Sequence, residues 1–248
     1  MTDKNRSIAA KNLLLASLPR DVYARIEPDI KALSLKTGHV LHRPGDKIND
    51  LYFPTTCMIS VTVRVAGGQT IEVDTIGNRE VVGINALMGN HETTYTEYIV
   101  QVSGGAFRIA ASAVQKEFNR NTAMHDVMMK YLQAMIAEIS QNVACNRIYT
   151  LNERCARWLL EVRERIGTDE IPLTQDFIAE MLGVRRAGVA EALGRLKAKR
   201  AIQYSRGRIQ VIDTRRLEKA SCECYLVLKK EYDRLLGTTL VMNGLSPE

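Results

Sequence analysis

The stretch from about Thr122 to Asn146 constrains the fold of this 248-residue chain more than any other. Its apolar side chains recur every three to four residues, which is the period of a helix that forms a coiled-coil seam. About 25 residues at 1.5 Å each make a rod of roughly 37 Å, which is too long for a small domain to cover. We therefore expect a homodimer through this helix. The expected interface residues are Met128, Leu132, Met135, Ile139 and Asn142 or Val143.

Before this helix, from about residue 30 to 112, the pattern is one of short strands. Val61–Val65 and Thr70–Ile76 alternate with period two on either side of Gly67–Gly68, which predicts a hairpin. Further strands are expected at Gly38–Leu41, Asp50–Phe53 and Tyr95–Val102. Turn signals stand at Pro44-Gly45-Asp46, Gly77-Asn78, Gly89-Asn90 and Gly104-Gly105. Many short strands with frequent turns indicate a sandwich or barrel. Short helices are expected on either side, from Pro19 or Arg20 to Ile30 and from Ala111 to Phe118.

After the long helix the chain is helical and then β. Leu151–Ile166 is amphipathic and ends at Gly167. Thr174 is a good N-cap for a helix that Gly183 closes, and a second helix is expected from Arg185 to Lys199. Two short strands follow around a turn at Arg206-Gly207. Two helices, a glycine turn and a tight hairpin form a winged helix-turn-helix pattern. One more helix is expected from Arg216 to about Leu236.

Charge is concentrated in this last part of the chain. The net charge is +6, but between Arg185 and Arg216 ten basic side chains stand against only two acidic ones, Glu191 and Asp213. Such a block favours a polyanionic partner, nucleic acid before an anionic membrane. No apolar run approaches the roughly 18–20 residues of a membrane span, and the N-terminus lacks a secretory signal pattern. Five cysteines, an odd number, predict reduced thiols in the cytoplasm.

The segment Leu173–Leu196, with Ile202 and Ser205–Ile209, closely resembles the DNA-binding domain of the Crp/Fnr superfamily of bacterial transcription regulators. Its sequence is LTQDFIAEMLGVRRAGVAEALGRL. The upstream order also matches, with Pro44-Gly45-Asp46, a double-glycine hairpin, Gly83 and a dimerisation helix. The resemblance implies an α+β chain with a jelly-roll sensor domain (1–120), a dimerisation helix (121–146), a winged helix-turn-helix domain (147–213) and a helical tail (214–248). It implies a regulator that binds an inverted repeat as a homodimer and that is no enzyme, with double-stranded DNA, a second copy and RNA polymerase as partners and no membrane.

The second helix of the motif carries the expected base contacts. Arg185, Arg186, Ala187 and Glu191 face away from the stripe that packs on the preceding helix. Arginine can pair with guanine, glutamate can accept from cytosine, and an alanine methyl can contact thymine. By resemblance, Arg186 matches the family's first base-reading arginine, whereas Ala187 and Glu191 replace its glutamate and second arginine. The expected phosphate contacts are Thr174, Gln175, Arg195, Arg206 and Arg208, with Lys197 and Lys199 as weaker candidates.

The sensor half departs from the family's cyclic AMP pattern. Gly83 is followed by Ile84 where cyclic AMP-binding members have a ribose-binding glutamate, and Thr94, then Tyr95, stand where they have a phosphate-binding arginine. We therefore expect cyclic AMP to bind weakly or not at all and expect no cofactor, and the effector stays unidentified. Arg79 and Glu80 could substitute only if their loop shifts. An effector other than cyclic AMP is expected between the barrel and the long helix.

Two alternatives remain from the sequence, a barrel enzyme and a protein-interaction module with an incidental basic tail. A metal-dependent barrel enzyme needs clustered histidines, and His39 and His42 point to opposite faces of one expected strand. An N-terminal iron–sulfur cysteine cluster is absent, because the first cysteine is Cys57. Cys222 and Cys224, placed on one helix, would lie about 200° apart and make a poor chelate. No metal site is expected.

Overall fold

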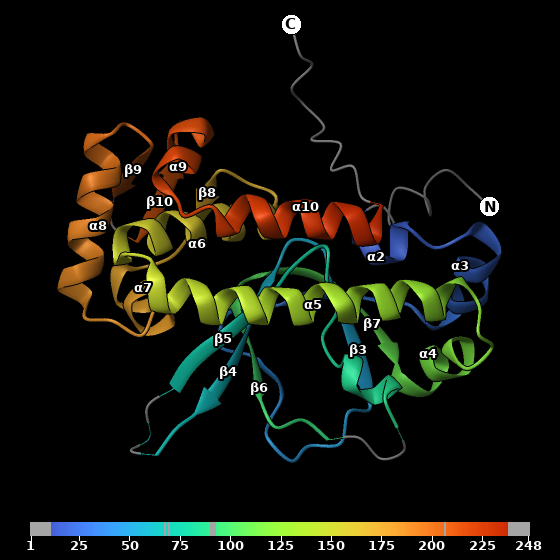
Figure 1. Cartoon of the computed structure of the whole chain (residues 1–248). Coiled ribbons are helices and arrows are strands. Elements are labelled where there is room, and N and C mark those ends of the chain that lie inside the picture. The colour runs from blue at the N-terminus through green and yellow to red at the C-terminus, as the bar shows by residue number, and fades with distance from the viewer. Residues whose placement is uncertain (1–10, 67, 69, 90–92, 206, 238–248) are drawn as a thin grey trace, which may run out of the picture.

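The computed structural model describes residues 11–66, 68, 70–89, 93–205 and 207–237. Helix α5 (Ala123–Ile148) runs the width of the molecule in Figure 1. The barrel strands lie along one side of α5 and the tail helix α10 (Cys224–Leu236) along another. A helical domain with a small sheet stands at the C-terminal end of α5. No helix of these described ranges is long and apolar enough to cross a membrane.

The N-terminal part is a jelly-roll of two antiparallel sheets, as the sequence predicts. One sheet has the order β1-β7-β3 and the other β2-β6-β4-β5, in which β4 and β5 form the expected hairpin. The elements are α2 (Leu13–Ala16), α3 (Arg20–Ile26), η1 (Glu27–Asp29), β1 (Lys31–Leu35), β2 (Val40–His42), β3 (Asp50–Pro54), β4 (Met58–Arg64), β5 (Thr70–Ile76), η2 (Ile84–Leu87), β6 (Glu97–Val102), β7 (Gly104–Ala110) and α4 (Ala111–Phe118).

The interpretation of Gly104-Gly105 as a turn is wrong, because both residues begin strand β7. A Cβ on Gly104 would lie 2.5 Å from the backbone nitrogen of Cys57, so the two chain segments approach too closely for a side chain. The carbonyl of Gly105 accepts from the backbone N–H groups of Thr55 and Thr56, at 2.9 and 3.2 Å. These glycines therefore serve a close approach between strands, which is the other common role of glycine in a sheet.

The C-terminal domain has the expected winged helix-turn-helix order, with one strand more than the sequence predicts. Strand β8 pairs with β10 in a sheet of order β8-β10-β9. With only two residues, β8 gives no period-two signal. The elements are α6 (Leu151–Ile166), β8 (Glu170–Ile171), α7 (Gln175–Met181), α8 (Arg186–Ala198), β9 (Ile202–Ser205), β10 (Arg208–Val211), α9 (Thr214–Ala220) and α10.

The tail is two helices where the sequence predicts one. Helix α9 begins after its N-cap Asp213, whose carboxylate accepts from the backbone N–H of Arg216, and the chain then turns at 221–223 before α10. Helix α10 lies along α5, where Tyr232 and Leu235 pack on Ala134. The tail thus returns from the winged domain to the long helix.

Candidate nucleic-acid interface

Helices α7 and α8 take their geometry from local signals that the sequence already contains. The Thr174 hydroxyl accepts from the backbone N–H of Phe177 at 3.2 Å, which caps α7. Gly183 has φ +63°, a left-handed conformation that glycine adopts without strain, and it turns the chain toward α8. The N-cap and the turn are confirmed.

Helix α8 separates a buried stripe from an exposed one. Val189, Leu193 and Leu196 are buried in one core with Ile178, and Phe177 packs against this core from α7. The remaining stripe is exposed, and a Cβ on Gly194 would meet nothing within 4 Å. Its members are Arg185, Arg186, Ala187, Ala190, Glu191 and Gly194. The side chains between the two arginines and Glu191 are small, so this surface of the helix can enter a major groove of DNA.

Exposed ion pairs hold the charged side chains of α8 in the free protein. Arg186 lies 3.4 Å from Asp176, and Glu191 lies 2.5 Å from Arg195 one turn later. Exposed pairs of this kind contribute little stability, so DNA groups can replace either partner at small cost. In the free protein, then, neither Arg186 nor Glu191 is tied to a buried partner.

The wing brings further basic groups to the same domain. Arg208 of β10 pairs with Glu170 of β8 at 2.7 Å, and Lys197 lines one shallow groove together with Arg208. Lys199 is exposed at the end of α8. Arg206 lies outside the described residues. Gln175, half-buried, and the exposed Thr174 begin α7, where the Thr174 hydroxyl is already engaged as the cap.

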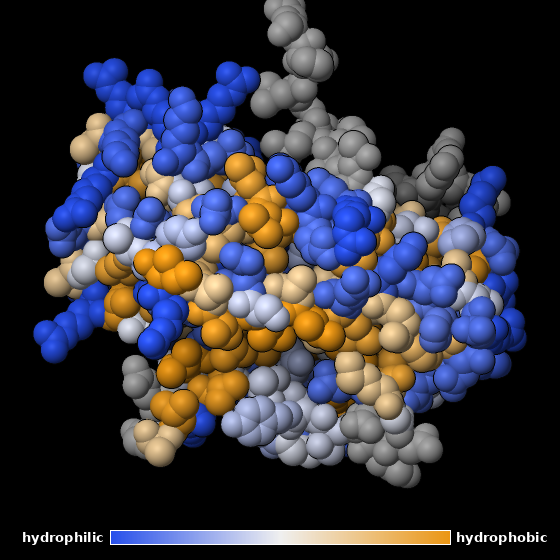
Figure 2. Space-filling model, in the orientation of Figure 1, coloured by the Kyte–Doolittle hydropathy of each residue, from blue (hydrophilic) through white to orange (hydrophobic). Residues whose placement is uncertain are grey.

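Helix α5 exposes an apolar stripe that coincides with only part of the predicted seam. Met128 is fully buried and Leu132 nearly so, and Met135 packs against the same core, so these residues cover the helix's own barrel. Met128 and Leu132 are therefore buried within the protomer, whereas Ile139 and Val143 of the predicted seam are exposed. The exposed residues, which we call the α5 stripe, are Met129, Ile136, Ile139 and Val143, with 47, 62, 43 and 68% of their surface accessible. Figure 2 shows this apolar surface along the middle of α5, from where it continues over the β4–β5 hairpin.

The predicted effector residues differ in burial and in the groups that they contact. Ile84 is buried in the barrel core, and Thr94 is buried with its hydroxyl donating to the Thr96 carbonyl at 2.9 Å. Tyr95 is 77% exposed. Gly83 has φ +89° and lies against Ile48, where it begins the η2 turn. These residues, although close in sequence, therefore lie in different surroundings.

Arg79 and Glu80, the proposed substitutes, belong to a buried ionic network between the domains. Arg165 of α6 is fully buried, and its guanidinium lies 3.0 Å from Glu80 and 2.6 Å from Glu138 of α5. Arg79 lies 3.1 Å from Glu80 and 3.3 Å from Glu164. Buried charges need such partners, which is why Arg79 and Glu80 are not free to face a ligand.

The same network extends to the tail helix. The Tyr232 hydroxyl donates to Glu138 at 2.6 Å, and the Arg79 guanidinium stacks 4.2 Å above the Tyr232 ring. Barrel loop, long helix, winged domain and tail therefore meet at one charged centre. Sequence reasoning missed Arg165, Glu138 and Glu164, because charged residues on amphipathic helices are normally solvated. The alternation of basic and acidic residues along α6 gave no sign of which ones turn inward.

A cavity of about 290 Å³ lies beside this network, between β5, α5, α6 and the end of α7. Glu72 and Asp74 of β5 line it, together with Arg157 and Trp158 of α6 and Ile139 of the α5 stripe. The Trp158 indole N–H donates to Glu72 at 3.0 Å. Desolvation by burial raises the pKa of Glu72 to about 7, against the hydrogen bonds from Ser60 and Trp158. The cavity adjoins both the barrel and the winged domain.

A model of the Crp-like helix-turn-helix domain matches residues 153–220, and a model of the cyclic nucleotide-binding domain matches residues 32–121. Among curated proteins no match was found.

Solved structures share the fold at low sequence identity. FixK2 from Bradyrhizobium japonicum is 15% identical, with a TM-score of 0.61 over 78% of this chain and 98% of that one. TTHB099, a CRP-family transcriptional regulator from Thermus thermophilus, is 18% identical, with a TM-score of 0.60 over 77% and 96%. CLP, a regulator from Xanthomonas campestris that responds to c-di-GMP, is 15% identical, with a TM-score of 0.55 over 78% and 99%.

Proposed function

The chain belongs to the Crp/Fnr superfamily of transcription regulators, and from this premise we propose that it binds an inverted repeat in double-stranded DNA as a homodimer. The observation that carries the proposal is the division of α8 into a buried apolar stripe and an exposed stripe that runs from the N-cap Arg185 to Gly194. Two such helices, related by a two-fold axis, would enter major grooves about one helical turn apart, roughly 34 Å.

The α5 stripe supports the homodimer. Four large apolar side chains are exposed at heptad-like spacing on a helix of 26 residues. The barrel and α10 cover two other sides of α5, so the stripe is an apolar side left for a second copy. Monomeric proteins rarely expose a contiguous apolar band of this kind.

Allosteric control by an effector other than cyclic AMP forms the second part of the proposal. The cavity between β5, α5 and α6 touches the barrel, the dimer helix and the winged domain, so a ligand there could bias their relative orientation. Ile84 and Thr94 supply neither the ribose-binding carboxylate nor the phosphate-binding guanidinium of the cyclic AMP pattern. RNA polymerase is the partner that such a regulator would contact on DNA.

Selection of bound DNA from a random pool tests the proposal. We expect enrichment of a two-fold symmetric sequence whose affinity falls steeply with salt, as phosphate contacts require. The same selection with cyclic AMP present should return the same sequence at the same affinity. Enrichment of no sequence, or affinity without salt dependence, would contradict a DNA-binding function.

A further inference from the structure

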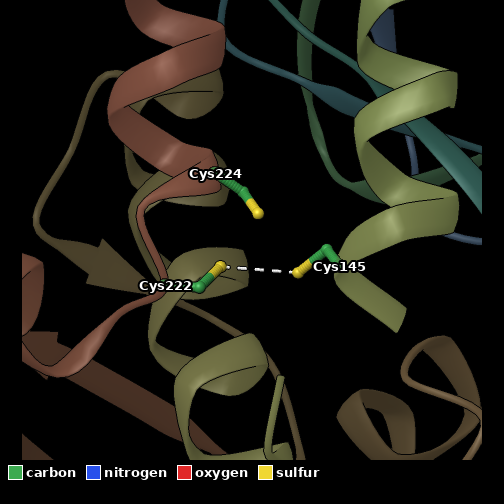
Figure 3. A group of neighbouring side chains, drawn as sticks. All are labelled: Cys145, Cys222 and Cys224. Atoms are coloured by element: carbon green, nitrogen blue, oxygen red, sulfur yellow. Dashed lines mark hydrogen bonds between the residues drawn. The ribbon is translucent and has the colours of Figure 1, made fainter. Parts of the chain in front are cut away.

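Three cysteines from distant parts of the chain meet at the junction between the long helix and the tail. Cys145 lies near the C-terminal end of α5, Cys222 in the turn before α10, and Cys224 at the first position of α10 (Figure 3). All three are at most 3% exposed, and their sulfur atoms lie within 4.8 Å of one another. The Sγ atoms of Cys145 and Cys222 are 3.4 Å apart.

The break between α9 and α10 creates this arrangement. On a continuous helix Cys222 and Cys224 would point about 200° apart, and this geometry led the sequence analysis to discount them. The turn at 221–223 instead directs both sulfur atoms toward α5. That geometric premise of the prediction is therefore wrong.

Polar contacts hold the three sulfur atoms close together. Either of the Cys145 and Cys222 thiols can donate the hydrogen bond across their 3.4 Å contact. Gln141 of α5 donates its amide N–H to Cys224 at 3.0 Å. Thiols lose their protons when they bind metals and metalloids, so an ion bound here replaces the hydrogen bond between the two thiols.

We propose that Cys145, Cys222 and Cys224 form a binding site for a thiophilic ion that takes three sulfur donors, the class to which trivalent arsenic belongs. Soft thiolate sets select soft ions over those that prefer oxygen ligands. Within the described part of the chain, no imidazole or carboxylate joins the three sulfur atoms. Tetrahedral zinc would therefore lack a fourth protein ligand, whereas a three-coordinate ion is complete.

Arsenite can bind to the three thiols by ligand exchange, which needs no oxidant. Three As–O bonds of As(OH)₃ break and three As–S bonds form. The three thiol protons leave with the three hydroxyl groups as water, so arsenic stays trivalent. The product carries no net charge, which suits a buried position. Because the ligands come from both α5 and the tail, the bound ion ties the dimer helix to the segment that follows the wing.

Titration of the reduced full-length protein with sodium arsenite, in the absence of DNA, tests the site. We expect one arsenic per chain and, at the arsenic X-ray absorption edge, three sulfur neighbours and no oxygen. Cys222→Ser and Cys224→Ser should each weaken binding by more than the roughly 10–100-fold that loss of a supporting residue costs. Cys57→Ala removes a buried thiol of the barrel and serves as the matched control that keeps full binding.

Several results would overturn the site. These are no binding by the reduced wild-type protein, retained oxygen neighbours at the arsenic, or unchanged affinity in both serine variants. A Cys145–Cys222 disulfide in protein purified under reducing conditions would do so as well. The absorption measurement uses the wild-type protein, so it decides the matter even if a variant fails to fold. No outcome depends on DNA binding.

Discussion

At the scale of single residues, the molecule separates charges that stabilise the fold from charges that face a partner. Arg165 is fully buried between Glu80 and Glu138, and removing one member of such a group leaves an uncompensated charge. Arg186 and Glu191 are exposed, and their ion-pair partners, Asp176 and Arg195, are exposed as well. Substitution in the first group should therefore affect folding, and substitution in the second should affect binding.

Arg186→Ala should weaken binding to the selected DNA by about 1–3 kcal/mol per half-site and relax the preference at one base pair. The melting temperature should equal that of the wild type, because the Arg186 side chain is exposed. Competition binding with single-base variants of the selected site measures both effects. Lys116→Ala on α4, which removes an exposed positive charge on the opposite side of the molecule from α8 (Figure 1), is the matched control. An equal loss on all sequences would show that Arg186 contacts phosphate alone.

Glu72 should make the folded protein less stable at alkaline pH. Its folded pKa of about 7 is raised above the ordinary value of 4.5. The contribution to stability is therefore complete below pH 4.5 and is lost as the pH rises through 7. Between pH 5.5 and 8.0 the loss attributable to Glu72 is up to about 2 kcal/mol in the free energy of unfolding.

Denaturant unfolding at the two pH values tests this. Glu72→Gln should show a smaller fall in stability than the wild type. Asp29→Asn, at an exposed position outside the cavity, should behave as the wild type. If the free energy of unfolding falls by the same amount in Glu72→Gln and in the wild type, Glu72 is not the cause of the pH dependence.

At the scale of secondary-structure elements, the sequence predicts those features that are determined by residues close together in the chain. The bounds of α4 and α6, the N-cap at Thr174 and the β4–β5 hairpin follow from spacing, caps and turns, and all four are confirmed. The face of α5 that meets the barrel did not follow, because apolar residues surround much of this helix. Only packing decides that Met128 turns inward and Ile136 outward.

The corrected face of α5 gives a prediction that separates dimerisation from folding. Ile136→Asp with Val143→Asp, both on the exposed stripe, should yield a folded monomer, because carboxylates would be buried in the dimer but not in the protomer. Leu132→Asp, by contrast, should unfold the barrel side of α5, where this residue is buried. Sedimentation and circular dichroism of each variant distinguish the two results.

Lys130→Asp introduces a charge on α5 about 100° from Met129, outside the α5 stripe, and should leave the dimer intact. A stripe variant that stays dimeric, or a wild type that is monomeric at micromolar concentration, would show that the stripe has another use.

At the scale of the whole molecule, the C-terminal tail connects the winged domain back to the long helix α5. It leaves the winged domain through α9 and returns along α5 through α10, where Tyr232 joins the buried network. Sequence reasoning recognised the tail as helical but could not place it, because its turn at 221–223 has neither glycine nor proline. The same turn brings Cys222 and Cys224 to Cys145. Contacts between distant segments, both ionic and thiol, were thus the part of the molecule that local patterns could not predict.

The central claim is that two copies present α8 to one face of DNA, and the spacing of the half-sites tests it most directly. Binding of the selected inverted repeat should be compared with a series in which base pairs are inserted between the half-sites. We expect five inserted base pairs, about half a helical turn, to reduce affinity to that of a single half-site, because the two recognition helices then face opposite sides of the duplex. Affinity that is unchanged by the insertion would contradict a two-fold dimer reading both half-sites at once.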